Sequence, residues 1–192
     1  YMNNASDTEI SVIMIQEVER MDRVIKQLLD FSKPVLLNRE ELFIDSLLKE
    51  FLKLESLEKK SRNIEIKSRF TDHNILVTVD RDKIRQVLLN LWLNSLAAIE
   101  DKGGVIEIRC GINPNLNMAV IEFQDNGCGI KKENLPHIFD PYFTTRKTGT
   151  GIGLSIVHSI IDAHNGKIEV TSDESKGTTF IIYLPIKTGD PK

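Results

Sequence analysis

The chain has 192 residues, of which 41% are hydrophobic and 28% are charged, and this composition excludes a disordered or collagen-like protein. A formal net charge of −3 leaves no basic field over the whole chain, so we expect no nucleic-acid partner. Two cysteines are too few for a disulfide scaffold, and no apolar run reaches the length of a membrane-spanning helix, which together indicate a soluble chain of the cytoplasm.

The first predicted element is a helix over residues 9–33. Its apolar side chains recur at spacings of three and four residues, at Ile10, Met14, Val18, Met21, Val24, Ile25, Leu28 and Phe31. Pro34 ends the segment. The stripe is wide for a lone surface helix, so we expect a partner, either a second copy or a neighbouring helix in a bundle. Packing against the rest of its own chain is the alternative.

The middle of the chain alternates helical and extended patterns. Helical spacing covers residues 42–57, and two strands joined by a turn follow at 64–70 and 75–80. A long helix is predicted over 80–100, because acidic residues open it and a Gly-Gly pair follows it.

The second half is predicted to add two strand pairs and one helix: strands 105–112 and 118–125, helix 152–164, and strands 167–172 and 178–185. The segment from 126 to 151 is rich in glycine, proline and threonine and has room for at most a short helix near Lys132. Helices interleaved with antiparallel hairpins predict an α+β fold, a two-layer sandwich with its helices on one face of the sheet.

The helix over 80–100 carries two asparagines between two apolar faces. One face holds Ile84, Val87, Leu88, Leu91, Ser95 and Ala98, and the other holds Leu89, Leu93 and Leu96. We therefore expect this helix to be largely buried, with Asn90 and Asn94 one turn apart in the seam. An unpartnered buried amide costs about 1–3 kcal/mol, so the pair indicates either a polar ligand or hydrogen bonds to neighbouring backbone.

Two glycine-rich segments stand next to regular elements. DNGCGI (125–130) directly follows a strand, so Asp125 ends that strand beside glycines that permit close backbone approach. GTGIGL (149–154) opens a helix, whose N–H groups and dipole suit phosphate, and Arg146 and Lys147 precede it. Its spacing fits neither the dinucleotide fingerprint nor the P-loop. Taken alone, the first segment is typical of a plain turn, and the second fits a flexible surface loop as well as it fits a phosphate site.

Taken in order, these motifs resemble the ATP-binding (GHKL, or Bergerat) fold that bacterial sensor histidine kinases share with Hsp90, DNA gyrase B and the MutL mismatch-repair ATPases. The matching segments lie within residues 80–186 and are QVLLNLWLNSLAAI (86–99), DNGCGI (125–130), IFDPYFTTR (138–146), GTGIGL (149–154) and GTTF (177–180). The resemblance implies an ATP-binding catalytic domain over 37–192. It implies that residues 1–36 are a remnant of the dimerisation and histidine-phosphotransfer hairpin.

The resemblance also implies a role for each site residue. Asp125 would accept a hydrogen bond from the amino group of adenine, Thr178 would assist, and Gly127 and Gly129 would leave room for the base. The other candidate contacts to ATP are Ile130, Thr144, Thr145, Lys147, Gly149, Gly151, Gly153 and Leu154, the threonines and the lysine in a mobile lid.

The same resemblance predicts a catalytic set and a metal ligand. Asn94 would offer its amide oxygen to Mg²⁺, and Asn90 would order a phosphate or a water bound to that ion. Arg146 completes the predicted catalytic set. Trp92 points away from the seam and is expected in the core.

Two departures from the family pattern bear on the reaction. The hydrolysing relatives carry a glutamate at the position of Asn90, and asparagine cannot act as that general base, which favours phosphoryl transfer over hydrolysis. A sensor kinase phosphorylates a histidine that is followed by Glu or Asp, and His73, His137, His158 and His164 all lack this context. We read these four as structural or solvated and expect the chain to be a piece of a longer kinase.

The predicted function is therefore that of the catalytic part of a two-component sensor histidine kinase. It would bind Mg-ATP and transfer the γ-phosphoryl to a histidine of the hairpin, for relay to an aspartate of a response regulator. The motifs most resemble nitrogen-regulation and zinc-resistance sensors, which implies a regulator of the sigma-54-activator type, a homodimeric intact protein and an inner-membrane anchor. The alternatives are an ATP-binding sensing or scaffold module without phosphotransfer, and a GHKL-type ATPase.

Overall fold

The structure is a computed structural model that describes Met14, Ile15, Val18 and residues 36–58, 63–71, 74–99, 103–146 and 149–187. Most of the helix predicted over 9–33 lies outside these residues, as do His73 and Lys147. Within the described ranges, no helix combines the length and the apolar character needed to cross a membrane.

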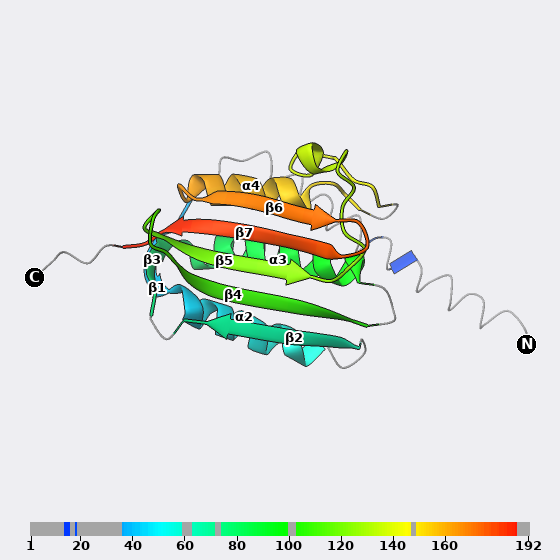
Figure 1. Ribbon diagram of the computed structural model, residues 1–192. Coiled ribbons are helices and arrows are strands. Elements are labelled where there is room, and N and C mark those ends of the chain that lie inside the picture. Colours follow the sequence, from blue (N-terminus) through cyan, green and yellow to red (C-terminus); the bar gives the residue numbers. More distant parts are fainter. Residues whose placement is uncertain are drawn as a thin grey trace, which may run out of the picture.

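A five-stranded sheet with the strand order β2-β4-β5-β7-β6 forms one layer of the fold (Figure 1). Its strands are β2 (Ile64–Phe70), β4 (Gly104–Asn113), β5 (Met118–Asp125), β6 (Lys167–Asp173) and β7 (Gly177–Pro185). β4 with β5, β5 with β7, and β6 with β7 pair antiparallel, whereas β2 pairs parallel with β4. Both hairpins predicted in the second half are thereby confirmed.

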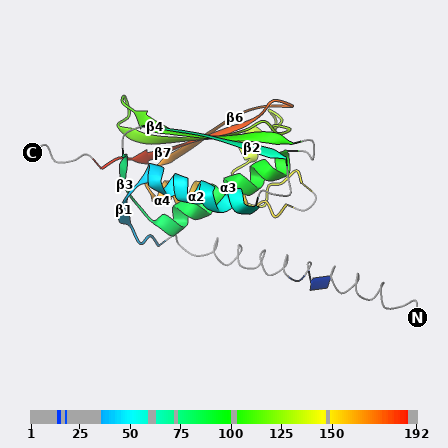
Figure 2. The same ribbon diagram turned by 90° about the horizontal axis from the view of Figure 1, so that it is seen from below.

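Three helices form the second layer, on one face of the sheet (Figure 2). They are α2 (Ile44–Glu58), α3 (Arg81–Ala98) and α4 (Gly153–Ala163). α3 begins where predicted, because the Asp80 side chain accepts a hydrogen bond from the backbone N–H of Lys83 at 3.0 Å and so caps the helix. The predicted α+β sandwich with its helices on one face is confirmed.

The core lies between the two layers and follows the side-chain periods of both. Along β5, Ala119, Ile121 and Phe123 are fully buried and alternate with side chains on the opposite face of the sheet. Trp92 of α3 is 3% exposed and packs edge-on against Phe51 of α2, with ring centroids 6.1 Å apart. The expectation that Trp92 belongs to the core is confirmed.

One expectation for the first half of the chain is wrong. The helix predicted from residue 42 begins at Ile44, because the preceding residues form β1 (Glu40–Phe43), in which Leu42 pairs with Val77. The two strands predicted after this helix are present as β2 and β3 (Leu76–Val79), and β3 pairs with β1 in a separate two-stranded sheet. Leu42 suits both a strand and the first turn of a helix, so apolar spacing alone placed the boundary too early.

The expectation that α3 is buried on both apolar faces is also wrong. Leu88 and Leu91, which face the sheet, are fully buried, but Leu89 is 41% exposed and Leu93 is 53% exposed. α2 and α4 pack along the flanks of α3, so nothing described covers its outer ridge (Figure 2).

The segment before α4 contains one short 3₁₀ helix, η2 (Leu135–His137). A short helix was predicted here near Lys132, and the structure places it a few residues later because Pro136 suits the first turn. The other described residues of this segment form turns and loops that lie at the edge of α4 (Figure 1).

Candidate functional site

The predicted seam on α3 faces the start of α4. Asn90 and Asn94 are half-buried and lie one turn apart on this flank of the helix. A Cβ atom added at Gly153, the first residue of α4, would lie 3.4 Å from the amide oxygen of Asn90. The structure therefore brings the asparagine motif and the second glycine motif together, although Asn90 and Gly153 lie 63 positions apart in the sequence.

Asp125 ends β5 as a buried carboxylate, 3% exposed. One oxygen accepts the hydroxyl of Ser95 at 2.9 Å, and the other accepts the backbone N–H of Gly127 at 2.9 Å. Burial raises the pKa of Asp125, whereas hydrogen bonds from Gly127, Ser95 and Thr178 and the charge of Arg146 act in the opposite direction. A carboxylate held in this way keeps lone pairs free to accept N–H groups of a ligand.

A second polar group lies opposite Asp125, on β7 and β6. Thr178 pairs with Asp125 across the strands, and its hydroxyl lies 3.0 Å from the hydroxyl of Ser172. The Ser172 oxygen also accepts the N–H of Ile130 at 2.8 Å and its hydroxyl donates to Gly177 O at 2.8 Å. Sequence reasoning missed Ser172, although its inward place in the alternation of β6 was a usable signal.

The glycines of the first motif allow close contact between backbones. A Cβ at Gly127 would lie 2.7 Å from Ala98 of α3, and one at Gly129 would lie 2.0 Å from the carbonyl oxygen of Asp173. Gly129 also has a φ of +71°, which favours glycine. Both positions thus need glycine for the approach of α3 and of the β6–β7 turn; their predicted role around a base stays a prediction.

The loop before α4 reaches back to the asparagine motif through Arg146. Its guanidinium donates to the side-chain oxygen of Asn94 at 3.3 Å and to the backbone oxygen of Asn94 at 2.9 Å. Thr144 accepts the backbone N–H of Arg146 at 3.1 Å, while Thr145 is exposed. The predicted catalytic residues Asn94 and Arg146 are thereby in direct contact.

The start of α4 has the features of an anion-binding helix end. No side chain caps it, and Ile152 before it has helical backbone angles. Gly149 donates its N–H to Arg146 O at 3.2 Å, and Gly151, with a φ of +69°, accepts the N–H of Tyr142 at 2.9 Å. The second glycine motif therefore forms a folded turn that leads into the helix.

Three further residues are predicted contacts to ATP, and the structure describes two of them. Ile130 and Leu154 are half-buried and pack against the core. Lys147 lies outside the described residues.

The donor set fits a magnesium ion that takes most of its ligands from phosphate and water. In the part of the chain that the structure describes, no three His, Cys, Asp or Glu side chains lie close enough to hold a metal. The amide oxygen of Asn94 is instead a single hard ligand, and its present partner, Arg146, is exposed. One protein oxygen suits Mg²⁺, which dehydrates reluctantly and bridges phosphates.

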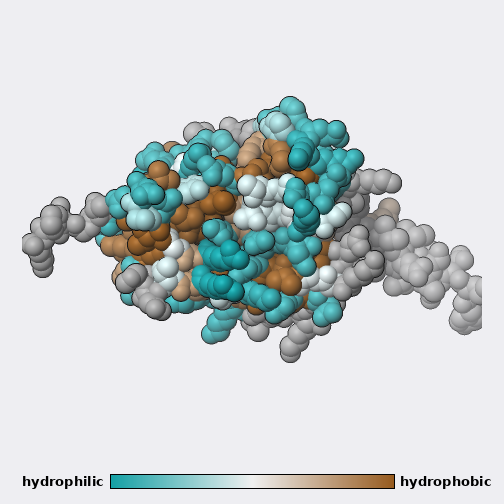
Figure 3. All heavy atoms as spheres, viewed as in Figure 1, coloured by the Kyte–Doolittle hydropathy of each residue, from teal (hydrophilic) through white to brown (hydrophobic). Residues whose placement is uncertain are grey.

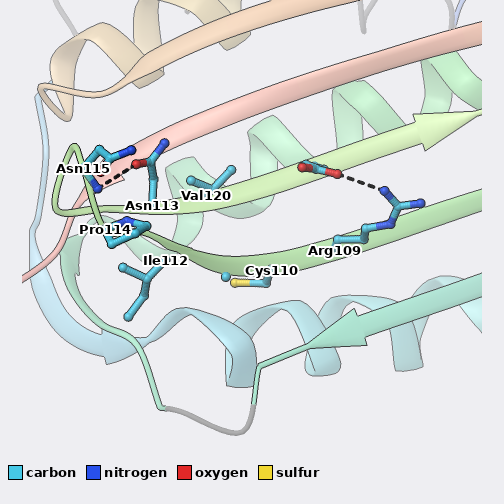
Figure 4. Close-up of a pocket in the computed structure, with 9 residues that line it drawn as sticks. Arg109, Cys110, Ile112, Asn113, Pro114, Asn115 and Val120 are labelled. Carbon is cyan, nitrogen blue, oxygen red and sulfur yellow. Dashed lines mark hydrogen bonds and ion pairs between the residues drawn. The ribbon is translucent and has the colours of Figure 1, made fainter.

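A hollow of about 400 Å³ lies elsewhere, on the open face of the sheet near the β4–β5 turn (Figure 4). Arg109 in its wall is already paired with Glu107 at 2.8 Å and with Glu122 at 3.2 Å. The surrounding face mixes hydrophilic and hydrophobic patches (Figure 3). None of the predicted site residues lines this hollow, so we place the functional site between α3, α4 and the ends of β5 and β7.

Curated relatives match nearly the whole chain. The sensor histidine kinase ZraS of Escherichia coli K12 is 37% identical over 93% of this chain. The signal transduction histidine-protein kinase AtoS of the same strain is 35% identical over 91% of it. The chain spans only 38% of the length of ZraS and 28% of the length of AtoS.

Solved structures show the same architecture. The catalytic domain of the histidine kinase ThkA matches 77% of this chain and 95% of its own length, with a TM-score of 0.68 and 32% identity. ThkA in complex with the response regulator protein TrrA matches 92% of this chain and 50% of its own, with a TM-score of 0.76 and 30% identity. Residues 79–188 match the family model described as histidine kinase-, DNA gyrase B-, and HSP90-like ATPase. Because this match covers more than half of the chain and contains every described site residue, the chain belongs to that family of ATPases.

Proposed function

We propose that this chain is the ATP-binding catalytic part of a two-component sensor histidine kinase. The observation that carries the proposal is the contact of Asn94 with Arg146, together with the close approach of Asn90 to the uncapped start of α4. This arrangement suits a triphosphate, because it offers amide oxygens, a guanidinium and a positive helix end within one site. The similarity to ZraS, AtoS and ThkA, all named histidine kinases, supports it.

The two ends of the site would bind different parts of ATP. The buried carboxylate of Asp125 would accept the amino group of adenine, with Thr178 beside it on β7. The phosphates would lie at the start of α4 and against Arg146. When bound, Mg²⁺ would supply charge neutralisation at the phosphates, with Asn94 as its protein ligand.

The chemistry proposed for the site is phosphoryl transfer. The bond between the γ-phosphorus and the bridging oxygen of ATP breaks, a phosphorus–nitrogen bond to a histidine forms, and ADP leaves. The site residues position the phosphates and balance their charge. Asn90 stands where a general base would activate water, and its amide cannot take that proton, so the phosphoryl group is kept for a better nucleophile.

The acceptor would be a histidine of the dimerisation hairpin rather than one of the described histidines. His164 is 2% exposed, and both of its ring nitrogens are hydrogen-bonded, to Ile160 O at 2.8 Å and to the N–H of Asp80 at 2.9 Å. His137 and His158 are paired with aspartates in turns and on α4. Residues 1–36 would belong to that hairpin and residues 37–192 to the catalytic domain.

The proposed partners follow from this assignment. The intact protein would be a homodimer, with this part on the cytoplasmic side of the inner membrane. It would pass the phosphoryl group to an aspartate of a response regulator, and the solved complex of ThkA with TrrA supports a partner of this class. The motifs favour a regulator of the sigma-54-activator type.

The test uses γ-labelled ATP with Mg²⁺. The chain would be incubated alone and with a separately made hairpin that carries a histidine followed by Glu or Asp. We expect acid-labile label on the added hairpin and little free phosphate. Free phosphate without label would instead show an ATPase, and neither signal would favour a binding module without phosphotransfer.

A further inference from the structure

Ser95 is a buried hydroxyl of α3 whose partner is unusual for a helical serine. Such hydroxyls commonly bond to a carbonyl of the preceding turn. Ser95 is 1% exposed and instead donates to the carboxylate of Asp125 at 2.9 Å, 30 residues further along the chain. Because a serine hydroxyl has one proton, this bond fully commits Ser95 as a donor.

Ser95 and Gly127 together fix the orientation of the Asp125 carboxylate. They give each oxygen of Asp125 one hydrogen bond at 2.9 Å, which fixes the rotation of the group and leaves lone pairs for a ligand. Burial favours the protonated form and raises the pKa of Asp125; Arg146 is the charged residue that acts against this, and the remaining opposing groups are neutral donors. Charge at Asp125 therefore depends on hydrogen bonds more than on an ion pair.

We propose that Ser95 is a positioning residue for base recognition, which keeps the Asp125 carboxylate oriented as an acceptor so that the site takes the amino group of adenine and rejects the carbonyl of guanine. This inference rests on the proposed ATP site. An ionised carboxylate only accepts hydrogen bonds, which suits the adenine amino group. A protonated carboxyl donates one, which suits the guanine carbonyl instead.

Loss of the Ser95 hydroxyl should therefore change selectivity as well as affinity. In Ser95→Ala, one oxygen of Asp125 stays buried without its donor, so the group protonates at higher pH. We expect ATP to bind ~10-fold more weakly, which corresponds to the loss of one hydrogen bond to a charged group. We also expect the preference for ATP over GTP to shrink, increasingly so from pH 8.5 to pH 6.

The experiment is calorimetric titration of the full chain with Mg-ATP and Mg-GTP across that pH range. Ser95→Thr keeps the hydroxyl and should restore the wild-type ratio of ATP to GTP affinity. Ser159→Ala is the matched control, because Ser159 is a partly buried serine of α4 that lies more than one turn beyond the start of that helix. Thermal unfolding of each variant checks that it is folded.

Two results would overturn the inference in distinguishable ways. A selectivity and pH profile in Ser95→Ala equal to wild type, while Asp125→Asn abolishes ATP binding, would remove the role of Ser95 and leave the proposed site intact. Unchanged ATP affinity in Asp125→Asn would overturn the proposed site itself, and the inference with it.

Discussion

Asn94 provides the most direct test of the proposed binding site. Its amide oxygen accepts the guanidinium of Arg146, and it is also the proposed ligand of Mg²⁺. Asn94→Asp adds a negative charge beside the phosphates and should weaken Mg-ATP binding ~10-fold or more in a calorimetric titration. Asn115→Asp adds the same charge at the exposed β4–β5 turn and is the control. Equal affinity in both variants would contradict the assignment of Asn94.

Two leucines of α3 separate the buried face from the exposed one. Leu91 is fully buried and Leu93 is 53% exposed, although they are two residues apart. Leu91→Ala should lower the free energy of unfolding by about 2–5 kcal/mol, because it leaves a cavity. Leu93→Ala should change it by less than about 0.5 kcal/mol. Urea denaturation measures both, and equal losses would mean that the outer ridge of α3 is covered in solution.

These leucines also show which features of single residues cannot be predicted from the sequence. Asn90 and Asn94 were found because amides interrupt an apolar pattern, which is a local signal. Leu88 and Leu89 have the same hydropathy, and only the position of the sheet makes one buried and the other exposed. The bond between Ser95 and Asp125 joins two elements of different kinds, so no spacing within either one predicts it.

At the scale of elements, the sequence predicted correctly the strand pairs whose two strands are adjacent in the chain. The hairpins β4–β5 and β6–β7 are joined by short turns, so adjacent strands in sequence are also neighbours in the sheet. β1 and β3 have only four residues each, and they pair although α2 and β2 lie between them in the sequence. β2 likewise pairs with β4, although β3 and α3 lie between them in the sequence. Pairings of this range leave no local mark on the chain.

The start of α3 and the end of α4 meet in a polar cluster outside the nucleotide site. Asp80 caps α3 and accepts the N–H of Asn38 at 2.8 Å, while His164, at the end of α4, accepts the N–H of Asp80 at 2.9 Å. Arg39 donates to Ala163 O at 2.6 Å. The segment that enters the domain is thus joined to both helices of the site.

His164 makes this cluster sensitive to acid. Burial lowers the pKa of His164, and Arg39 nearby acts in the same direction, against Ile160 and Asp80. The unfolded chain, with a histidine pKa of ~6.5, then binds more protons than the folded one, so stability falls as pH drops below that value. The melting temperature should decrease from pH 7.5 to pH 5.5, and the decrease should be smaller in His164→Gln.

The exposed His137 provides the control for that experiment. His137→Gln removes an imidazole that is bonded to Asp140 at the surface, outside the cluster. A pH dependence in His164→Gln as steep as in wild type would place the acid sensitivity elsewhere in the chain.

For the molecule as a whole, strand order predicts which parts resist opening. β5 and β7 have a strand on each side, whereas β2 and β6 are edge strands. An edge strand bonds its N–H groups on one side only, so alternate amides in β2 and β6 should exchange quickly and nearly all amides in β5 and β7 slowly. Hydrogen exchange followed by NMR measures this. Continuous protection along β6 would mean that a further element covers that edge.

The position of β7 in the sheet determines when this domain can form during its synthesis. β7 lies between β5 and β6, yet it is the last of these five strands to be made. Until the ribosome has passed Pro185, β5 exposes one edge, its apolar side chains lack part of their cover, and Thr178 is not in place opposite Asp125. A nascent chain of this protein therefore needs protection from aggregation until translation of the whole sheet is complete.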